Sequence, residues 1–246
     1  MDDLIRARIL EAAGQTRFRQ VEVHSSIDST QALLVSEGGD DGRVVVADHQ
    51  TAGRGRQGRS WLDVPGAMLM FSVLLKGVPP DEAALISLAA GVAVARAVGL
   101  FAPPSATAPW AHLKWPNDVR IGGRKVSGIL GELAPSGDYV VLGIGVNVGH
   151  DRGDLPDELG ATSLRIERGD PPRRDDLCAS ILRELEAVIG TDFMDAYRAL
   201  CETIGASVRV ERPDGSLEGT ATEVRDDGAL VVDGHVVMAG DVIHLR

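Results

Sequence analysis

The 246-residue chain has few cysteines, few aromatic side chains and a deficit of positive charge. Its two cysteines, Cys178 and Cys201, lack the close spacing of metal ligands and fall in apolar, helix-like stretches, so we expect buried thiols. Aromatic residues make up 4%, and 36 acidic against 25 basic residues give a formal net charge of −11. This balance repels phosphate backbones, which argues against general nucleic-acid binding but allows a small anion on a local basic patch.

Long apolar runs are also absent. No run approaches the ~20 residues of a membrane-spanning helix, and the acidic N-terminus lacks the apolar core of a signal peptide. The six histidines show no HExxH-type spacing, which argues against a structural zinc site. We therefore expect a cytoplasmic protein, and a hydrophobic content of 44% is enough for a substantial core.

Hydrophobic periodicity predicts helices and strands that alternate along the first two hundred residues. Strands are expected at 20–27, 42–50 and 67–76, and an antiparallel meander at 114–148. Helices are expected at 2–13, 28–38, 82–99, 176–189 and 193–201, with a short element near 163–169. This order predicts an α+β fold.

The texture of the sequence changes after Cys201. Short alternating segments are separated by Pro-Asp-Gly, Asp-Asp-Gly and Asp-Gly turns, which is typical of a small β-barrel or sandwich. We therefore expect two domains, 1–203 and 204–246.

The stretch TAGRGRQGRSW, residues 51–61, contains three glycines and three arginines. Glycines let backbone N–H groups approach a ligand, and arginines donate to carboxylate or phosphate, so the run suits an anion-binding loop. Gly53, Gly55 and Gly58 satisfy a GxGxxG pattern, but the residues that follow are a poor helix start. From this stretch alone, an anion-binding loop and a flexible surface loop are equally supported.

Two β-compatible segments around residues 122–123, both glycine, predict a tight hairpin. Its register would place Lys125 across from Arg120, and Ser127 across from Asp118. These four side chains would then share one face of the sheet. Asp118 is a guess for a metal ligand, but the sequence shows no clear metal site.

Lysine is scarce, with only Lys76, Lys114 and Lys125 in the chain. A chain that otherwise uses arginine has reason to keep a lysine where a compact ammonium is needed, at a reacting carboxylate or phosphate. We favour such a role for Lys125 and a surface role for Lys76. Lys114 shares the parity of Arg120, but six residues of strand between them span roughly 20 Å. It would therefore serve a distant part of an elongated ligand, or only the fold.

The apolar stretch GIGVNV, residues 143–148, contains two glycines and one asparagine. The glycines leave room on one face of the expected strand. Asn147 needs polar partners if it is buried. It could equally cap a turn just after the strand.

Four motifs occur in order: DSTQ at 28–31, QTAGRGRQGRSW at 50–61, KWPNDV at 114–119 with GRKVSGILGE at 123–132, and GIGVNV at 143–148. This ordered set resembles the biotin protein ligases, over about residues 1–200 and with a small β tail that also suits the family. The resemblance implies a mixed, mainly antiparallel sheet packed with helices, plus a small C-terminal β-barrel.

The resemblance also implies a two-step reaction. Biotin and ATP, with Mg²⁺, would give biotinyl-5′-AMP, and the biotinyl group would pass to a lysine of a biotin carboxyl carrier protein domain of acyl-CoA carboxylases. The protein would be a monomer or a homodimer. Some family members carry an N-terminal DNA-binding helix-turn-helix, but only about 20 residues precede the first expected strand, so we expect neither DNA binding nor repression.

Roles carried over from the resemblance fall on two sets of residues. Biotin would be bound by Ser29, Thr30, Gln50, Gly53, Arg54, Gly55, Arg56, Lys125 and Gly143. The nucleotide or adenylate would be bound by Arg56, Arg59, Trp61, Lys114, Asn117 and Asn147. Lys125 and Arg56 would be catalytic, and core packing is the alternative for Trp61. Gln31 and Gln57 depart from the family pattern, so a ligand contact from position 31 is in doubt.

Rival interpretations stay open. A lipoate–protein ligase or an octanoyl transferase resembles the same fold, and the transferase would not use ATP. A binding module without catalysis is an interpretation from another class, although Lys125 and the loop argue against it. RNA binding through the Arg/Gly run lacks the interleaved aromatic residues that such binding uses.

Overall fold

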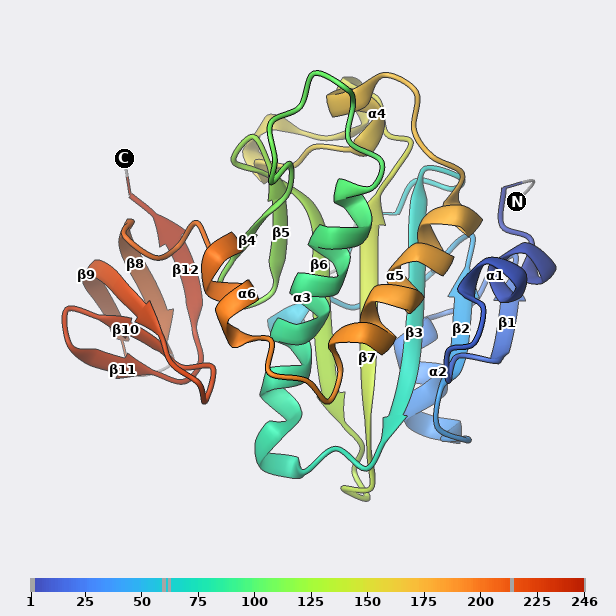
Figure 1. Cartoon of the computed structure of the whole chain (residues 1–246), viewed down its shortest axis with the longest axis horizontal. Coiled ribbons are helices and arrows are strands. Elements are labelled where there is room, and N and C mark those ends of the chain that lie inside the picture. Colours follow the sequence, from blue (N-terminus) through green and yellow to red (C-terminus); the bar gives the residue numbers. More distant parts are fainter. Residues whose placement is uncertain (1–2, 59–60, 62, 213–214, 246) are drawn as a thin grey trace.

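The computed structural model describes residues 3–58, 61, 63–212 and 215–245. Two sheets organise the chain (Figure 1). The larger sheet has seven strands in the order β1-β2-β3-β7-β6-β5-β4, with β1 and β2 parallel and the other neighbours antiparallel. Its strands are β1 (Gln20–His24), β2 (Arg43–Ala47), β3 (Met68–Lys76), β4 (His112–Lys114), β5 (Asp118–Ile121), β6 (Arg124–Leu133) and β7 (Tyr139–Asn147).

The smaller sheet is antiparallel throughout and has the order β11-β10-β9-β8-β12. Its strands are β8 (Ser207–Arg212), β9 (Gly215–Val224), β10 (Leu230–Val232), β11 (His235–Val237) and β12 (Asp241–His244). The α+β class with a mixed, mainly antiparallel sheet is confirmed. The division into domains at 1–203 and 204–246 stays a prediction.

The chain has one α-helix before β1, and the other described α-helices lie between strands in sequence. The α-helices are α1 (Arg6–Ala13), α2 (Thr30–Glu37), α3 (Ala83–Gly99), α4 (Leu164–Arg168), α5 (Arg174–Val188) and α6 (Met194–Leu200). Helix α2 begins where the sequence predicted, because the Ser29 hydroxyl accepts a hydrogen bond from the backbone N–H of Ala32. Among the described residues, no helix has the length and apolar character required to cross a membrane.

Side-chain alternation gives the larger sheet two different faces. On β3, Leu69, Phe71 and Val73 pack in the main apolar core, beneath α3 and α5, which lie side by side across the sheet (Figure 1). The alternate residues Met70 and Ser72 line a cavity. One face therefore stabilises the fold, and the other is available for a ligand.

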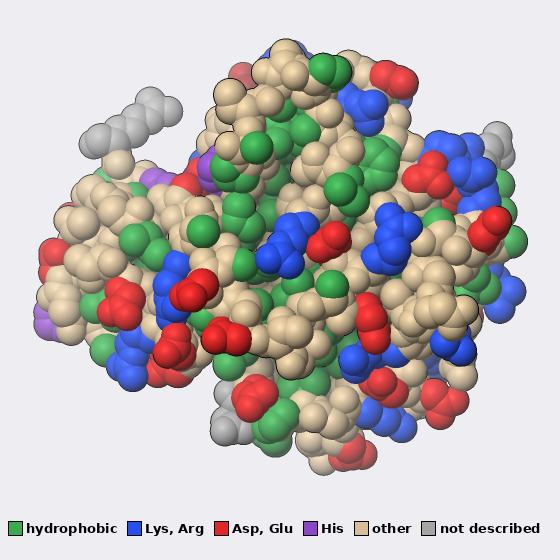
Figure 2. All heavy atoms as spheres, viewed as in Figure 1, with side chains coloured by type: hydrophobic (Ala, Val, Ile, Leu, Met, Phe, Trp, Pro, Cys, Tyr) green, Lys and Arg blue, Asp and Glu red, His purple; other side chains and the backbone are tan. Residues whose placement is uncertain are grey.

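The helix-covered face carries basic and acidic side chains in an interspersed arrangement (Figure 2). This mixture gives no continuous basic surface on that face.

The two sheets are joined through Trp115, which is 2% exposed. Its backbone N–H donates to the hydroxyl of Thr203 at 3.0 Å, and its indole N–H donates to the carbonyl of Gly228 at 2.9 Å. The predicted burial of the cysteines is confirmed for Cys178 and Cys201. Burial raises the pKa of the Cys178 thiol, which keeps it protonated.

Candidate active site

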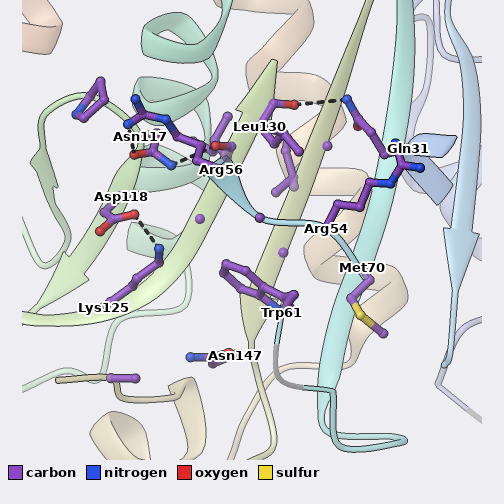
Figure 3. Close-up of a pocket in the computed structure, with 18 of the residues that line it drawn as sticks. Gln31, Arg54, Arg56, Trp61, Met70, Asn117, Asp118, Lys125, Leu130 and Asn147 are labelled. Carbon is purple, nitrogen blue, oxygen red and sulfur yellow. Dashed lines mark hydrogen bonds and ion pairs between the residues drawn. The ribbon is translucent and has the colours of Figure 1, made fainter. Parts of the chain in front are cut away.

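A cavity of about 540 Å³ lies against the face of the larger sheet that carries Met70 and Ser72. It is lined by residues of α2, β3, β6 and β7, by the 50–61 segment and by β12 of the smaller sheet. Figure 3 shows Gln31 and Met70 on one side of the cavity and Asp118 and Lys125 on the other. The two sides differ in charge, and they are described separately below.

The uncharged end of the cavity is formed by Ser29, Thr30, Gln31, Gln50 and Ser72. The Gln50 side-chain carbonyl accepts from the backbone N–H of Thr30 at 2.8 Å, and its NH₂ group donates to the Met70 sulfur at 3.2 Å. The hydroxyls of Thr30 and Ser72 are 2.8 Å apart. Because α2 starts at the cavity, its first residues meet β3 and the segment that follows β2, and this brings these groups together.

The charged end of the cavity is formed by Lys114, Asp118 and Lys125. The Lys125 ammonium is 2.5 Å from a carboxylate oxygen of Asp118. The backbone of Lys125 is fixed by an N–H donated to Gly160 and a carbonyl that accepts from Thr162. The ammonium is therefore held at the cavity by its own strand, by its neighbour β5 and by the segment after β7.

The prediction that Lys114 lies roughly 20 Å from the hairpin is wrong. The chain reverses between β4 and β5, so that Lys114 pairs directly with Asp118. Burial lowers the pKa of Lys114, and the positive charges of Arg120 and Lys125 lower it further, against the opposite effect of Asp118. Two ammonium groups therefore share one end of the cavity.

The predicted hairpin register is correct at Lys125, which pairs with Arg120, but wrong one step further. A register shift between Val119 and Arg120 places Ser127 opposite Val119 and Asp118 opposite Gly128. Ser127 is fully buried. Lys125 and Asp118 meet as a pair without Ser127.

Hydrogen bonds connect the beginning of the 50–61 segment with residues at and just after its end. The backbone N–H of Trp61 donates to the carbonyl of Gly53 at 3.2 Å. The Asp63 carboxylate accepts from the backbone N–H of Gln50 at 2.6 Å and contacts the His49 ring nitrogen at 2.7 Å. Asp63 thus fixes the start of the segment from its far end, and no motif in the sequence indicated this role.

Arg56 links the segment to both sheets. Its guanidinium donates to the Asn117 side-chain oxygen at 3.1 Å and to the Gly240 carbonyl at 3.4 Å, and it lies 3.8 Å from the Asp241 carboxylate. Asn117 in turn donates to the carbonyl of Ile129 at 3.0 Å. This arrangement holds the arginine at the cavity.

The other arginines of the run differ in position. Arg54 is exposed and lines the cavity together with the backbone of Gly55; it lies toward the Gln31 side in Figure 3. The predicted nucleotide contact at Arg59 lies outside the described residues. Gln57 has a left-handed backbone with φ of 56°, in the short 3₁₀ turn Arg56–Gly58. The poor helix start was predicted for the residues after Gly58; of these, Trp61, Asp63 and Val64 are described and are not helical.

Trp61 lies in the cavity against two strands that lack side chains there (Figure 3). An added Cβ would fall 2.6 Å from the indole ring at Gly128 and 2.9 Å from it at Gly145. The Lys125 ammonium is 5.1 Å from the ring centroid, in cation–π contact. Trp61 therefore lines the cavity, and its predicted contact with the nucleotide stays a prediction.

The glycine at 143 and the asparagine at 147 both lie on the cavity face of β7. An added Cβ at Gly143 would meet the side-chain oxygen of Gln31 at 2.6 Å. The space above Gly143 is therefore taken by a side chain of the protein. Asn147 is 7% exposed, and its amide donates to the Thr162 carbonyl at 2.9 Å, so it fixes the segment after β7.

Sequence comparisons identify the family to which this site belongs. The chain belongs to the biotin/lipoate A/B protein ligase family, whose model matches residues 23–148. Residues 203–245 match the biotin protein ligase C terminal domain. Within the family, this second match and the relatives below place the chain with the biotin protein ligases, which confirms the resemblance.

Three similar proteins illustrate this relationship. The biotin–[acetyl-CoA-carboxylase] ligase of Mycobacterium tuberculosis is 42% identical, over 93% of this chain and 90% of the relative. The bifunctional ligase/repressor BirA of Bacillus spizizenii is 33% identical, over 91% of this chain and 71% of the relative. The solved biotin protein ligase of Aquifex aeolicus in complex with biotin and ATP has a TM-score of 0.78 at 27% identity, covering 93% of this chain and 100% of that one.

Proposed function

We propose that this protein is an ATP-dependent biotin–protein ligase that forms biotinyl-5′-AMP and transfers the biotinyl group to a lysine of a biotin carboxyl carrier protein domain. The observation that carries this proposal is the charge asymmetry of the cavity. Biotin has a neutral ureido ring at one end and a carboxylate at the other. The cavity matches both, because one end offers uncharged hydrogen-bonding groups, with Arg54 as the only cation on that side among the residues labelled in Figure 3, and the other end offers two lysines beside Asp118.

The ring of biotin would occupy the uncharged end, near Ser29, Thr30, Gln50 and the glycines of the 53–55 segment, with Arg54 above it. Buried amide and hydroxyl groups of this kind discriminate well, since a ligand that cannot pair with them leaves them unsatisfied. The valerate chain would cross Gly143 and Gly145 beside Trp61. The carboxylate would then reach Lys125.

Lys125 and Arg56 are the proposed catalytic residues. During adenylation the carboxylate oxygen attacks the α-phosphorus of ATP and pyrophosphate leaves, so negative charge accumulates on the phosphate. An ammonium and a guanidinium held at the cavity stabilise that charge without reorganising. In the second step the same groups stabilise AMP as it leaves while the carrier lysine attacks the acyl carbon. The 50–61 segment would shield the mixed anhydride from water.

The nucleotide would lie toward Trp61, Lys114, Asn117 and Asn147. A further nucleotide contact from Arg59 is proposed from the sequence alone. Mg²⁺ fits this site as a companion of ATP, since it is commonly held by substrate phosphates and one or two carboxylates. Asp118 offers a carboxylate at the charged end. Among the described residues, no group of three or more potential metal-binding side chains exists. A resident metal cage is therefore not part of the proposal.

The carrier domain, a cytoplasmic location, the lack of a repressor function and a monomeric or homodimeric state stay predictions. ATP–pyrophosphate exchange with the purified protein tests the activation step, with biotin and lipoate supplied separately. Exchange with biotin alone supports the proposal. Exchange with lipoate alone would assign the chain to the other branch of its family, and exchange with neither would favour an acyl transferase or a binding module.

A further inference from the structure

Gln31 is the residue whose role the family pattern left in doubt, and it lies at the innermost part of the uncharged end. The side chain is buried, with 4% exposed. Its NH₂ group donates to the carbonyl of Val141 at 3.0 Å and to that of Leu130 at 3.5 Å (Figure 3). Its oxygen accepts from the hydroxyl of Ser72 at 3.2 Å. The side chain therefore extends from α2 to β6 and β7 and is fixed at both ends.

The position of Gln31 explains the glycine at 143. A Cβ at Gly143 would come within 2.6 Å of the Gln31 oxygen and 3.4 Å of the Ser72 hydroxyl. The glutamine therefore fills the place where a side chain of β7 would otherwise lie. It sets how far into the uncharged end a ligand can extend.

The hydrogen-bond directions at this end follow from counting protons. The Gln31 NH₂ must face the backbone carbonyl of Val141, so its oxygen faces Ser72, and Ser72 uses its only proton there. Thr30 then donates its own proton either to Ser72 across their 2.8 Å contact or to the side-chain carbonyl of Gln50 at 3.1 Å. Both hydroxyls have only lone pairs left for a ligand. A group that occupies this end must therefore bring N–H donors.

We infer that Gln31 determines which acid this ligase accepts, in two ways. It limits the depth of the uncharged end, and it accepts the proton of Ser72, so that this hydroxyl selects a ring with N–H donors, as a ureido ring has and a dithiolane ring lacks. The inference rests on the proposed function, since it names the specificity residue of that same site.

The test compares Gln31→Met with Gln31→Ala in the full chain. Methionine keeps the length of the side chain but lacks the oxygen that accepts the Ser72 proton, whereas alanine also deepens the uncharged end. Acid-dependent ATP–pyrophosphate exchange gives kcat and KM with biotin, desthiobiotin and lipoate, and titration calorimetry gives the affinity for each acid directly. Gln20→Ala, at an exposed glutamine of β1, is the matched control.

For Gln31→Met we expect the KM for biotin to rise about tenfold or more, with kcat little changed and lipoate unaffected. For Gln31→Ala we expect the same loss for biotin together with a gain for lipoate. A further check uses Gly143→Ala, which should weaken biotin binding in the wild-type protein but add no loss in Gln31→Ala.

Equal changes for all three acids would show that Gln31 has only a structural role and would overturn the inference. An unchanged ratio between biotin and lipoate would do the same. Failure of the proposed function looks different, because the wild-type protein would then show no biotin-dependent exchange. Calorimetry would in that case still report whether Gln31 governs acid binding.

Discussion

The packing of Trp61 against Gly128 allows a quantitative prediction for Gly128→Ala. The new methyl carbon would lie 2.6 and 2.7 Å from two ring carbons of Trp61, and ordinary contact begins near 3.4 Å. The ring must therefore retreat by about 0.8 Å, or the segment that carries it must lift. Adding a methyl group to such a packed site costs about 1–3 kcal/mol.

This cost should appear in ligand binding rather than in unfolding. Trp61 lies on a segment outside the sheet, so the segment can open while the core keeps its packing. We expect the affinity for biotin, measured by titration calorimetry, to fall roughly 5- to 150-fold, and the melting temperature to change little. Gly99→Ala is the matched control, because an added Cβ at Gly99 has no atom within 4 Å.

A double-mutant cycle decides whether the tryptophan is the cause. In a Trp61→Ala background the ring is absent, so Gly128→Ala should add almost no further loss. If Gly128→Ala reduces affinity equally in both backgrounds, the methyl group acts on the ligand or on the Lys125 ammonium, which would lie 3.0 Å from it, and the reasoning from ring packing is wrong.

Three further predictions concern charged groups. Lys125→Ala should lower kcat for ATP–pyrophosphate exchange by ~100-fold or more and change the affinity for biotin far less, because the charge acts on the transition state; near-normal turnover would remove this lysine from the chemistry. Asp63→Asn should raise the KM for biotin about fivefold, since it weakens a charged hydrogen bond to the backbone of Gln50, and steady-state kinetics with an unchanged KM would contradict this. Burial and two neighbouring cations lower the pKa of His244 below its usual 6.5, so this residue favours the folded state above pH 6.5 and that stability is lost as the pH falls below 6.5. Thermal unfolding at pH values above and below 6.5 should show a smaller loss of stability for His244→Gln than for wild type. An equal loss would refute this role of His244. The pKa of His150 is also lowered, so it contributes in the same direction in both proteins.

The elements of the fold were largely predictable because each has a strong local signal. The buried strand at 67–76, the apolar helix at 82–99 and the glycine hairpin at 122–123 all appear where periodicity and turn chemistry placed them. The sequence predicted the register of the hairpin next to its turn, at Lys125 and Arg120, but not beyond Val119. The register shift beside Val119 depends on how β5 and β6 fit together in three dimensions, and no residue pattern predicts it.

The site was predictable where a motif supplied its residues and unpredictable where tertiary packing did. Lys125 stood out through the scarcity of lysine, and it lies at the cavity. Asp63 did not stand out, because its role arises only when the chain folds back on residues 49–50. The role of the glycines at 128 and 145 was equally unpredictable. The indole ring of Trp61 occupies the space where their side chains would lie, and only the folded structure shows this.

The contact of Arg56 with the backbone of Gly240 and with Asp241 has a consequence for how this protein can evolve. Family models treat the two parts of the chain as separate modules. Arg56 belongs to the first part, and it contacts a carbonyl and a carboxylate of the second part. Residues of both parts therefore position the arginine at the cavity. Hybrids that exchange the smaller module between relatives should therefore work only when both sides of this contact are inherited together.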